Sequence, residues 1–191
     1  MPVRDADATR IRILDAARAE FAAVGLAGAR VDRIAAEAES NVRMIYAYFS
    51  NKSGLFDAAV RAAVDAMAAA VPPEPTALGE WAGRLFDYHC ADPSALRISL
   101  WAQLERPAVA GEPMEAYLAK TAAVASFAGD AGAAVDLLTI VYAIAQARLL
   151  TPEGLLAADG SDPGDPARIA AHRAAIVAAA TATADALRAS R

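Results

Sequence analysis

Apolar residues recur along the chain at the spacing of helices rather than of strands. Residues 8–24 carry Ile13, Ala17 and Phe21 at intervals of four, which places them in one stripe of an amphipathic helix. Gly25 follows, at a position where a left-handed residue commonly ends a helix. Proline interrupts helix interiors, so the gaps between prolines are where helices can lie. The pattern predicts about nine helices, over residues 8–24, 31–38, 42–48, 52–70, 76–91, 94–105, 113–127, 131–150 and 167–189.

Two stretches are predicted to be connections. Pro72, Pro73 and Pro75 end the fourth helix and form a stiff linker. Residues 151–166 are rich in glycine, proline and aspartate, which is typical of a loop. The sequence contains no alternating strand pattern and no internal repeat, so the predicted fold class is all-α.

Alanine dominates the composition, with 54 of the 191 residues, and it is the best helix former because it loses no side-chain entropy. A membrane-spanning helix needs roughly 20 mostly apolar residues, and the best run, Leu137 to Ala145, is shorter. Cys90 is the single cysteine, so an intramolecular disulfide and a cysteine-cluster metal site are both excluded. We therefore expect a cytoplasmic protein with no membrane contact, no metal and no cofactor.

The net charge of −5 is unevenly distributed along the chain. Residues 1–61 hold 9 basic and 8 acidic residues, a net charge of +1, whereas residues 62–191 hold 9 and 15, a net charge of −6. The acidity therefore belongs to the C-terminal two-thirds, and this mild asymmetry alone supports no functional conclusion.

The second and third predicted helices form a helix-turn-helix pattern. Asn41 can cap the third helix by accepting from backbone N–H groups at its start. Ile45, Tyr48 and Phe49 fall on one side of that helix, whereas Arg43, Tyr46 and Ala47 fall on the rest of its surface. A short helix with an inward aromatic side and an outward arginine suits insertion into a DNA major groove, where arginine can pair with guanine.

The residues of segment 8–60 that match a known family keep that family's order and spacing. They are Ile13–Ala17, Phe21, Gly25, Val31, Ile34, Ala35, Ala38, Tyr46, Tyr48, Phe49, Lys52, Leu55 and Phe56. On these positions the segment resembles the N-terminal domain of the TetR family of transcriptional regulators. Residues 76–191 resemble the family only in being a helical domain punctuated by prolines.

The resemblance implies a three-helix DNA-binding domain over residues 1–51, followed by a connecting helix and an effector-binding and dimerisation domain, together residues 52–191. The implied DNA-binding residues are Arg30, Asn41, Val42, Arg43, Met44, Tyr46, Ala47 and Lys52. For Arg43 and Lys52 the alternative is a solvated surface cation. For Tyr46 the alternative is a place in the core, where Tyr48 and Phe49 are expected.

The segment also departs from the family pattern. Glu39 stands where the turn usually has glycine, so it would be strained in a left-handed turn unless the turn differs. Val42 replaces the usual lysine or proline, Ala47 the usual histidine, and Ala29 the usual capping threonine. These departures leave open a weaker affinity for DNA or an unusual operator.

Large and polar side chains of the C-terminal region are candidates for an apolar or aromatic effector, although any helical core would also use them. The candidates are Phe86, His89, Trp101, Leu104, Tyr117, Phe127, Tyr142 and Gln146. His89 and Cys90 could suggest metal or nucleophile chemistry, but no partner stands at metal-ligand spacing, and the favoured reading of Cys90 is a buried residue that packs as a small hydrophobe.

Residues 131–150 and 167–189 carry apolar stripes that the resemblance assigns to a four-helix homodimer interface, with packing inside one chain as the alternative. The residues predicted for it are Leu138, Tyr142, Leu149, Ile169, Ile176, Ala180 and Leu187.

The sequence thus predicts a DNA-binding transcriptional regulator, with a ligand-responsive repressor on a palindromic, double-stranded DNA operator as the first reading. The alternatives are a helical small-molecule-binding protein and a regulator that binds DNA without responding to an effector. No catalytic triad, metal cluster or phosphate loop is present, so an enzyme is not expected.

Overall fold

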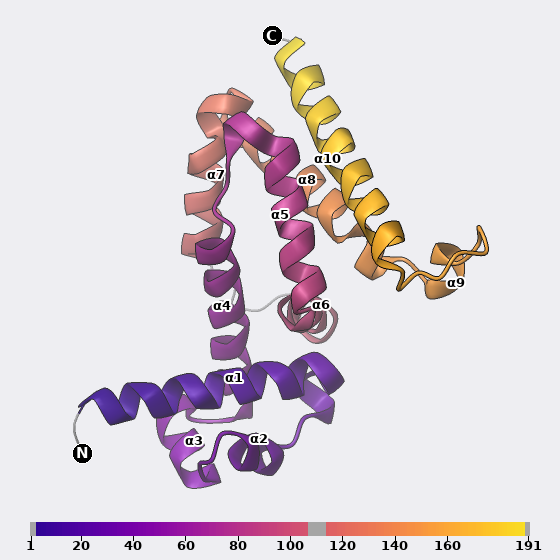
Figure 1. Ribbon diagram of the computed structural model, residues 1–191. Helices are drawn as coiled ribbons and strands as arrows, with labels where there is room; N and C mark the ends of the chain where they lie inside the picture. Colours follow the sequence, from indigo (N-terminus) through magenta and orange to yellow (C-terminus); the bar gives the residue numbers. More distant parts are fainter. Residues whose placement is uncertain (1–2, 107–113, 190–191) are drawn as a thin grey trace. The chain divides into compact units, whose positions relative to one another are not determined.

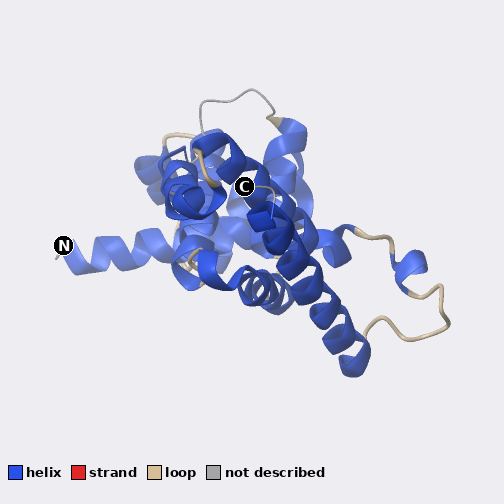
Figure 2. Ribbon diagram, turned by 90° about the horizontal axis from the view of Figure 1, so that it is seen from above, coloured by secondary structure: helices blue, strands red, loops and turns tan. Residues whose placement is uncertain are grey.

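A computed structural model describes residues 3–106 and 114–189, and every element in these ranges is a helix (Figures 1 and 2). The helices are α1 (Val3–Gly28), α2 (Val31–Glu37), α3 (Val42–Phe49), α4 (Lys52–Ala70), η1 (Pro75–Ala77), α5 (Leu78–Ala91), α6 (Ser94–Glu105), α7 (Met114–Ala128), α8 (Ala131–Leu150), α9 (Glu153–Leu156) and α10 (Pro166–Ala189). The all-α prediction is confirmed. The structure adds the short helices η1 and α9, each at a proline in a stretch expected to be a connection.

The chain divides into two compact units. The first comprises residues 1–67 and 93–113, and the second comprises residues 68–92 and 114–191. Helix α6 therefore belongs with the N-terminal helices, whereas the functional boundary predicted from the sequence lies after residue 51. Nothing in the local pattern of α6 signals this, because its place depends on contacts with α1 about 75 residues earlier in the chain (Arg97 Nε donates to the carbonyl of Ala22 at 2.9 Å).

The core of the first unit contains the apolar stripe predicted for α1. Ile13, Ala17 and Phe21 are fully buried. The ring of Phe21 meets that of Phe56 of α4 edge-on, with centroids 5.0 Å apart. Edge-to-face pairs of this kind add to the stabilisation that burial itself provides. The predicted amphipathic helix is confirmed.

Gly25 interrupts α1 as predicted, because its φ of 72° lies in the left-handed region. The chain then makes one further helical turn to Gly28. Glu105 of α6 accepts hydrogen bonds from the backbone N–H groups of Leu26 at 2.6 Å and Ala27 at 3.3 Å. A Cβ on Gly25 would lie 2.8 Å from the ring of Trp101. Glu105 thus satisfies the N–H groups that lose their helical partners at the bend. The absence of a side chain at Gly25 allows α6 to pack closely against it.

The turn between α2 and α3 contains Glu39 in the left-handed region, with φ 48°. It is held by a hydrogen bond from the N–H of Ser40 to the carbonyl of Ala35, at 2.9 Å. The turn therefore has the form that suits glycine, although this chain places glutamate there, which is costly because its Cβ crowds the backbone.

Replacing Glu39 by glycine is expected to raise the free energy of unfolding of the first unit by up to about 1 kcal/mol, because relief of the left-handed strain exceeds the added entropy of the unfolded chain. Urea unfolding followed by circular dichroism measures this change. Glu37→Gly is the control, because Glu37 has helical geometry in α2 and the same substitution there should destabilise by about 1 kcal/mol. A loss of stability in Glu39→Gly would contradict the assignment of strain.

In the second unit, α5 packs against α8 and α10, and α7 packs against α8. The approach of α10 to α5 is close at Gly79, where a Cβ would meet the hydroxyl of Thr181 and lie 2.8 Å from the carbonyl oxygen of Val177. Small residues allow such short interaxial distances. The indole of Trp81 on α5 donates to the carbonyl of Val71 at 3.2 Å, so its buried N–H is satisfied.

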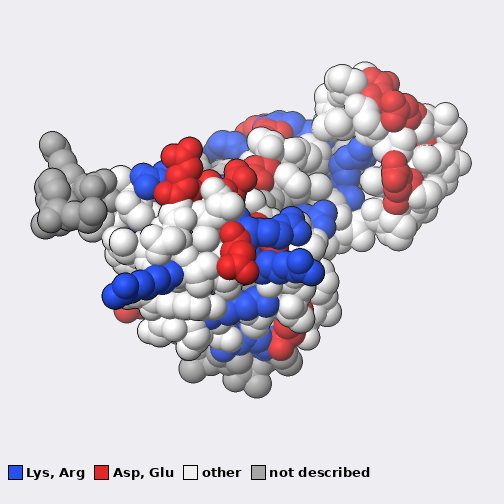
Figure 3. Space-filling view, turned by 90° about the horizontal axis from the view of Figure 1, so that it is seen from below, with Lys and Arg blue, Asp and Glu red and all other residues white. Residues whose placement is uncertain are grey.

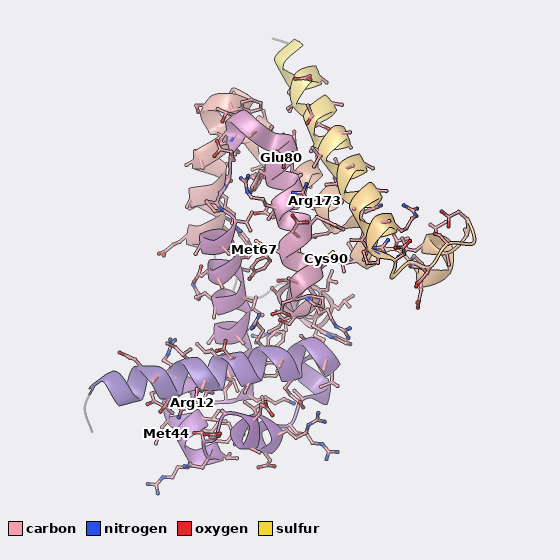
Figure 4. The ribbon with its side chains drawn as sticks, viewed as in Figure 1. Arg12, Met44, Met67, Glu80, Cys90 and Arg173 are labelled. Carbon is pink, nitrogen blue, oxygen red and sulfur yellow. The ribbon has the colours of Figure 1, made fainter. Side chains whose placement is uncertain are left out.

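Arg173 of α10 links the same two helices electrostatically. Its Nε lies 2.9 Å from a carboxylate oxygen of Asp87, and its Nη2 lies 3.6 Å from one of Glu80, both on α5. Figure 4 shows Glu80 and Arg173 pointing toward one another. Such exposed pairs contribute about 1 kcal/mol or less, so their main effect is to fix the register of α10 on α5.

Helix α8 is the one helix among residues 3–106 and 114–189 that is long and apolar enough to cross a membrane by length and composition alone. A third of its apolar window is buried inside the chain, and Arg148 is among its buried residues. A core helix of a helical domain has the same properties, so this is weak evidence for a membrane span.

Candidate DNA-binding surface and effector site

Helix α3 is anchored from one side and exposed on the other. Asn41 caps it as predicted, with its side-chain oxygen accepting from the N–H of Met44 at 2.9 Å. Ile45 and Phe49 are buried beneath it. The hydroxyl of Tyr48 donates to the carbonyl of Ala6 on α1 at 3.2 Å, so the predicted inward orientation of Tyr48 is confirmed.

The outward side of α3 consists of Arg43, Tyr46 and Ala47, all of which are exposed. Tyr46 keeps 42% of its surface accessible, which rules out the core alternative considered for it. Val42 and Met44 are half-buried at the flanks of this side, and Met44 is labelled in Figure 4. The arrangement has the dimensions and chemistry of a recognition helix, with its first turn free to meet base edges.

Helix α2 is held in place by Glu20 of α1, a residue not among the predicted site residues. Glu20 is only 8% exposed. One carboxylate oxygen accepts from the backbone N–H of Arg30 at 3.1 Å, and the other lies 3.1 Å from Nη2 of Arg33. An acceptor at the start of α2 satisfies a donor that has no partner within the helix. A signal was present, since Glu20 falls on the same stripe as Ala16 and Ala17.

The basic side chains of the first unit near α2 and α3 differ in exposure and in hydrogen bonds within the chain. Arg30 is exposed, whereas Lys52 is half-buried and its Nζ donates to the carbonyl of Ala27 near the end of α1 at 3.2 Å. Arg12 of α1 reaches the carbonyl of Ala38 after α2, at 3.4 Å. Figure 3, seen from the side on which α2 and α3 lie, shows basic side chains gathered there with acidic ones among them. Such a surface suits contact with a phosphate backbone.

Polar and aromatic side chains of α5, α7 and α8 meet inside the second unit. The rings of Trp81 and Tyr142 meet edge-on, with centroids 5.8 Å apart. Gln146, one turn further along α8, lies 3.4 Å from Nε2 of His89 on α5. The structure thus brings together three of the side chains predicted for an effector, namely His89, Tyr142 and Gln146.

Lys120 of α7 belongs to the same cluster, although it was not among the predicted site residues. It is only 6% exposed. Its Nζ lies 5.4 Å from the centre of the Tyr142 ring and 5.9 Å from that of Tyr117, within the range of cation–π attraction. A lysine in a predicted helix is normally assigned to solvent, so the sequence carried no signal of its burial.

Burial sets the protonation of the other groups in the cluster. It lowers the pKa of His89, which favours the neutral imidazole. It raises the pKa of Tyr142 to about 12, which keeps the phenol a hydrogen-bond donor. The amide nitrogen of Gln146 lies 3.4 Å from Nε2 of His89, an arrangement that suits a neutral ring with its proton on Nδ1. Within the described residues, this buried Nδ1 has no hydrogen-bond partner.

Other predicted effector residues lie elsewhere. Trp101 and Leu104 belong to α6 in the first unit, where Trp101 packs at Gly25 and Leu104 is 74% exposed. Phe86 is buried on α5 and its ring centre lies 5.8 Å from that of His172. Phe127 is half-buried. Trp101 and Leu104 were assigned to the C-terminal domain because sequence order alone suggested it, whereas their helix packs on α1.

Only some of the residues predicted for a dimer interface remain accessible to a partner in the structure. Leu138, Ile176 and Ala180 are already buried within one chain, so they have little surface left for a partner. Leu149 is exposed, and Tyr142, Ile169 and Leu187 are half-buried. The stripe of α10 that contains Ile176 and Ala180 is thus used inside the chain, and its opposite side, made mainly of alanines, is exposed.

The described residues offer few other groups that could bind a metal ion or act as a nucleophile. Among the described residues, no group of three or more His, Cys, Asp or Glu side chains could hold a metal ion. Cys90 is exposed, in contrast to the buried position predicted for it. Partial burial raises the pKa of its thiol, although the charge of Arg148 opposes the shift. A thiol whose pKa is raised is a poor nucleophile.

Comparison with known proteins agrees with this arrangement. The family model "Bacterial regulatory proteins, tetR family" matches residues 13–59, and "Tetracyclin repressor-like, C-terminal domain" matches residues 77–181. The HTH-type transcriptional repressor SCO4008 of Streptomyces coelicolor is 41% identical over 162 residues, which are 80% of this chain and 84% of that protein. The HTH-type transcriptional repressor NicS of Pseudomonas putida is 47% identical over 53 residues, 28% of this chain and 25% of its own.

Solved structures resemble both units. SCO4942 of Streptomyces coelicolor, described as a transcriptional regulator, has a TM-score of 0.72 and 34% identity, covering 88% of this chain and 96% of its own. A TetR-family protein from Mesorhizobium loti has a TM-score of 0.54 at 20% identity, covering 93% of this chain and 97% of its own, and shows the fold alone. Together with the capped, outward-facing α3, these likenesses show that the chain belongs to the TetR family and is a DNA-binding transcriptional regulator.

Proposed function

We propose that the protein is a cytoplasmic, homodimeric repressor that binds a palindromic operator and is released from it by a small effector. The observation that carries this proposal is the orientation of α3, which exposes Arg43, Tyr46 and Ala47 while Ile45 and Phe49 fix it to the unit beneath. A helix held in this way can enter a major groove without further rearrangement, and two-fold symmetry would place two such helices on successive grooves.

The exposed sides of α8 and α10 support dimerisation. On α8 the exposed residues Ile140, Ala143, Ala147 and Leu150 follow one another around the same side. On α10 the exposed side consists mainly of alanines, namely Ala171, Ala174, Ala175, Ala178 and Ala182. Such surfaces allow helices of two chains to approach closely. The residues of the proposed interface therefore differ from most of the residues that the apolar stripes predicted for it.

The cluster of α5, α7 and α8 supports an effector response. It combines aromatic rings with several polar groups inside a helical unit, which is the usual composition of a small-molecule site. An effector would release the operator only if it bound one of two conformations of the protein more tightly than the other.

Operator binding tests the proposal directly. Fluorescence anisotropy with labelled fragments of the DNA upstream of the coding region should reveal one fragment bound with a marked dependence on salt. Arg43→Ala should weaken binding to that fragment by about tenfold to a hundredfold, because a bidentate contact with guanine contributes about 1–3 kcal/mol. The salt dependence should change little if Arg43 contacts a base rather than a phosphate.

Arg84→Ala is the matched control, because Arg84 is an exposed arginine of α5, outside the DNA-binding helices. It should leave the affinity for the operator within about twofold of the wild-type value. Equal affinities of the wild-type and Arg43→Ala proteins would show that α3 is not the recognition helix. A wild-type protein that binds no fragment in a salt-dependent manner would contradict the proposed function as a whole.

A further inference from the structure

A single buried carboxylate of α1 is bonded to two groups at the start of α2. Glu20 is only 8% exposed, and its two oxygens have different partners. One accepts from the backbone N–H of Arg30, and the other lies 3.1 Å from Nη2 of Arg33. Glu20 therefore fixes both the backbone and one long side chain at the start of α2.

Arg33 is held by this contact without being covered. Its side chain keeps 65% of its surface accessible. A guanidinium carries several N–H donors in a planar fork, so a contact through Nη2 leaves donors for a second acceptor. The carboxylate restricts the side chain of Arg33 before any ligand arrives, and such preorganisation lowers the entropic cost of binding.

Arg33 lies on the helix that meets the DNA backbone in helix-turn-helix proteins. In these proteins the second helix of the motif enters the major groove, and the first helix crosses the backbone. Those two helices are α3 and α2 in this chain, and Arg33 is an exposed residue of α2, three positions after the exposed Arg30. A phosphate is an acceptor whose geometry matches the fork of a guanidinium.

The charge balance around α2 and α3 makes the placement of each cation important. Residues 28–52 hold four basic and three acidic residues, a net charge of +1, and Figure 3 shows side chains of both signs on this side. One of the four, Lys52, already donates to the carbonyl of Ala27. Attraction by net charge is therefore weak, and affinity for the phosphates depends on how the individual arginines are placed.

We propose that Glu20 is a positioning residue for DNA binding, which holds the guanidinium of Arg33 on the surface of α2 so that it contacts a phosphate of the duplex. This inference rests on the proposed use of α2 and α3 as the DNA-binding surface. The opposite effect is expected if Glu20 only neutralises Arg33, because removal of its charge would then strengthen DNA binding. Under the proposal that removal weakens binding, since Arg33 loses its support.

Binding to a fluorescein-labelled duplex of mixed sequence tests the role of Arg33, because phosphate contacts do not depend on sequence. Fluorescence anisotropy at several salt concentrations gives both the affinity and its salt dependence. Arg33→Met should weaken binding and lower the slope of log affinity against log salt concentration by about 1. Arg33→Lys keeps the charge but loses the fork, so binding should weaken by about threefold or more with the slope unchanged.

Glu20→Gln tests the support itself. The amide oxygen can still accept from the N–H of Arg30, whereas the amide nitrogen is a donor and cannot accept from Arg33. Affinity for the duplex should fall by about threefold to tenfold, the cost of ordering one long side chain at an interface. In an Arg33→Met background the same substitution should have no further effect, because its action passes through Arg33. Damage to the fold alone would persist in that background.

Two matched controls remove the same charges elsewhere. Asp15→Asn removes an exposed carboxylate from the same helix as Glu20, and it should bind DNA at least as tightly as the wild-type protein. Arg84→Met removes an exposed arginine of α5 and should bind as the wild-type protein does. Thermal melts followed by circular dichroism verify that each variant is folded.

Three results would overturn the proposal. They are unchanged or tighter DNA binding by Glu20→Gln, unchanged binding by Arg33→Met, and an equal effect of Glu20→Gln with and without Arg33. If Glu20→Gln does not fold, the exposed Arg33 still allows a decision. Binding by Arg33→Lys at the wild-type level would then show that only the charge matters, which contradicts positioning by Glu20.

The outcome is separable from that of the proposed function. If the variants behave as expected on the mixed-sequence duplex while no upstream fragment is bound preferentially, the proposed repressor fails and the role of Glu20 stands. If an upstream fragment is bound specifically while Glu20→Gln and Arg33→Met keep the wild-type affinity for both kinds of DNA, only the role of Glu20 is wrong.

Discussion

Replacing Ala178 by arginine is expected to leave the chain folded but monomeric. Ala178 lies in the middle of the exposed, small-residue side of α10. In the proposed dimer this side packs against a second copy at close range, where a guanidinium would be both too large and buried without a partner. Sedimentation velocity at micromolar protein concentration measures the change as a halving of the mass.

The same substitution should weaken operator binding far more than any single contact does. Two recognition helices joined in one dimer bind a palindrome with an advantage of about a hundredfold to ten-thousandfold over one helix alone. Ala178→Arg should lose most of that advantage, and binding to an isolated half-site should remain at the level of the wild-type protein. This contrast separates loss of dimerisation from damage to α3.

Ala122→Arg is the matched control for this experiment. Ala122 is an exposed alanine of α7 in the same unit, on a helix outside the proposed interface. It should remain dimeric with unchanged operator affinity. A dimer of unchanged mass in Ala178→Arg would show that the chain associates through another surface, and a wild-type protein that sediments as a monomer would contradict dimerisation altogether.

The features that the sequence predicts well are the ones that depend on nearby residues. The cap at Asn41, the bend at Gly25 and the two sides of α3 all follow from residues within one or two helical turns, and the structure confirms each of them. The left-handed backbone at Glu39 is one of the two possibilities that the resemblance left open, because the family usually has glycine at this position. Local propensity and hydrophobic spacing decide such features before any long-range contact forms.

The features that the sequence does not predict depend on contacts between distant segments. Alanine lies on every side of α10, so the spacing of its larger residues shows a stripe without showing which neighbour that stripe meets. The structure uses Ile176 and Ala180 inside the chain. Placement of Trp101 in the first unit depends in the same way on the packing of α6 against the bend at Gly25.

The burial of charged side chains is a further feature that the spacing of apolar residues along the chain does not predict. Glu20 and Lys120 are both charged residues in helices and would be assigned to solvent by composition alone. Glu20 is buried because it satisfies the start of α2 and pairs with Arg33, whereas Lys120 is buried among tyrosine rings. Each case depends on partners from another element, and only Glu20 had a signal in the sequence, its place on the stripe of Ala16 and Ala17.

The second large effect is expected at Gly79, where α5 and α10 are in close contact. Gly79→Ala should lower the free energy of unfolding of the second unit by about 2–3 kcal/mol, the upper part of the range for overpacking. The added Cβ would lie 2.8 Å from the carbonyl oxygen of Val177, and this atom belongs to the backbone of α10. Rotation of a side chain cannot relieve that contact, so α10 would have to move as a body.

Gly154→Ala is the matched control, because Gly154 is also helical and a Cβ there meets nothing within 4 Å. An ordinary glycine-to-alanine change in a helix stabilises by about 0.5–1 kcal/mol, so the two substitutions should have opposite signs. The two tryptophans allow the units to be followed separately, since Trp81 lies in the second unit and Trp101 in the first. Urea unfolding of both variants in a Trp101→Phe background, followed by the fluorescence of Trp81, measures the second unit alone. Equal or higher stability of Gly79→Ala would show that α10 is not held at this distance from α5, and the intramolecular use of its apolar stripe would then be wrong.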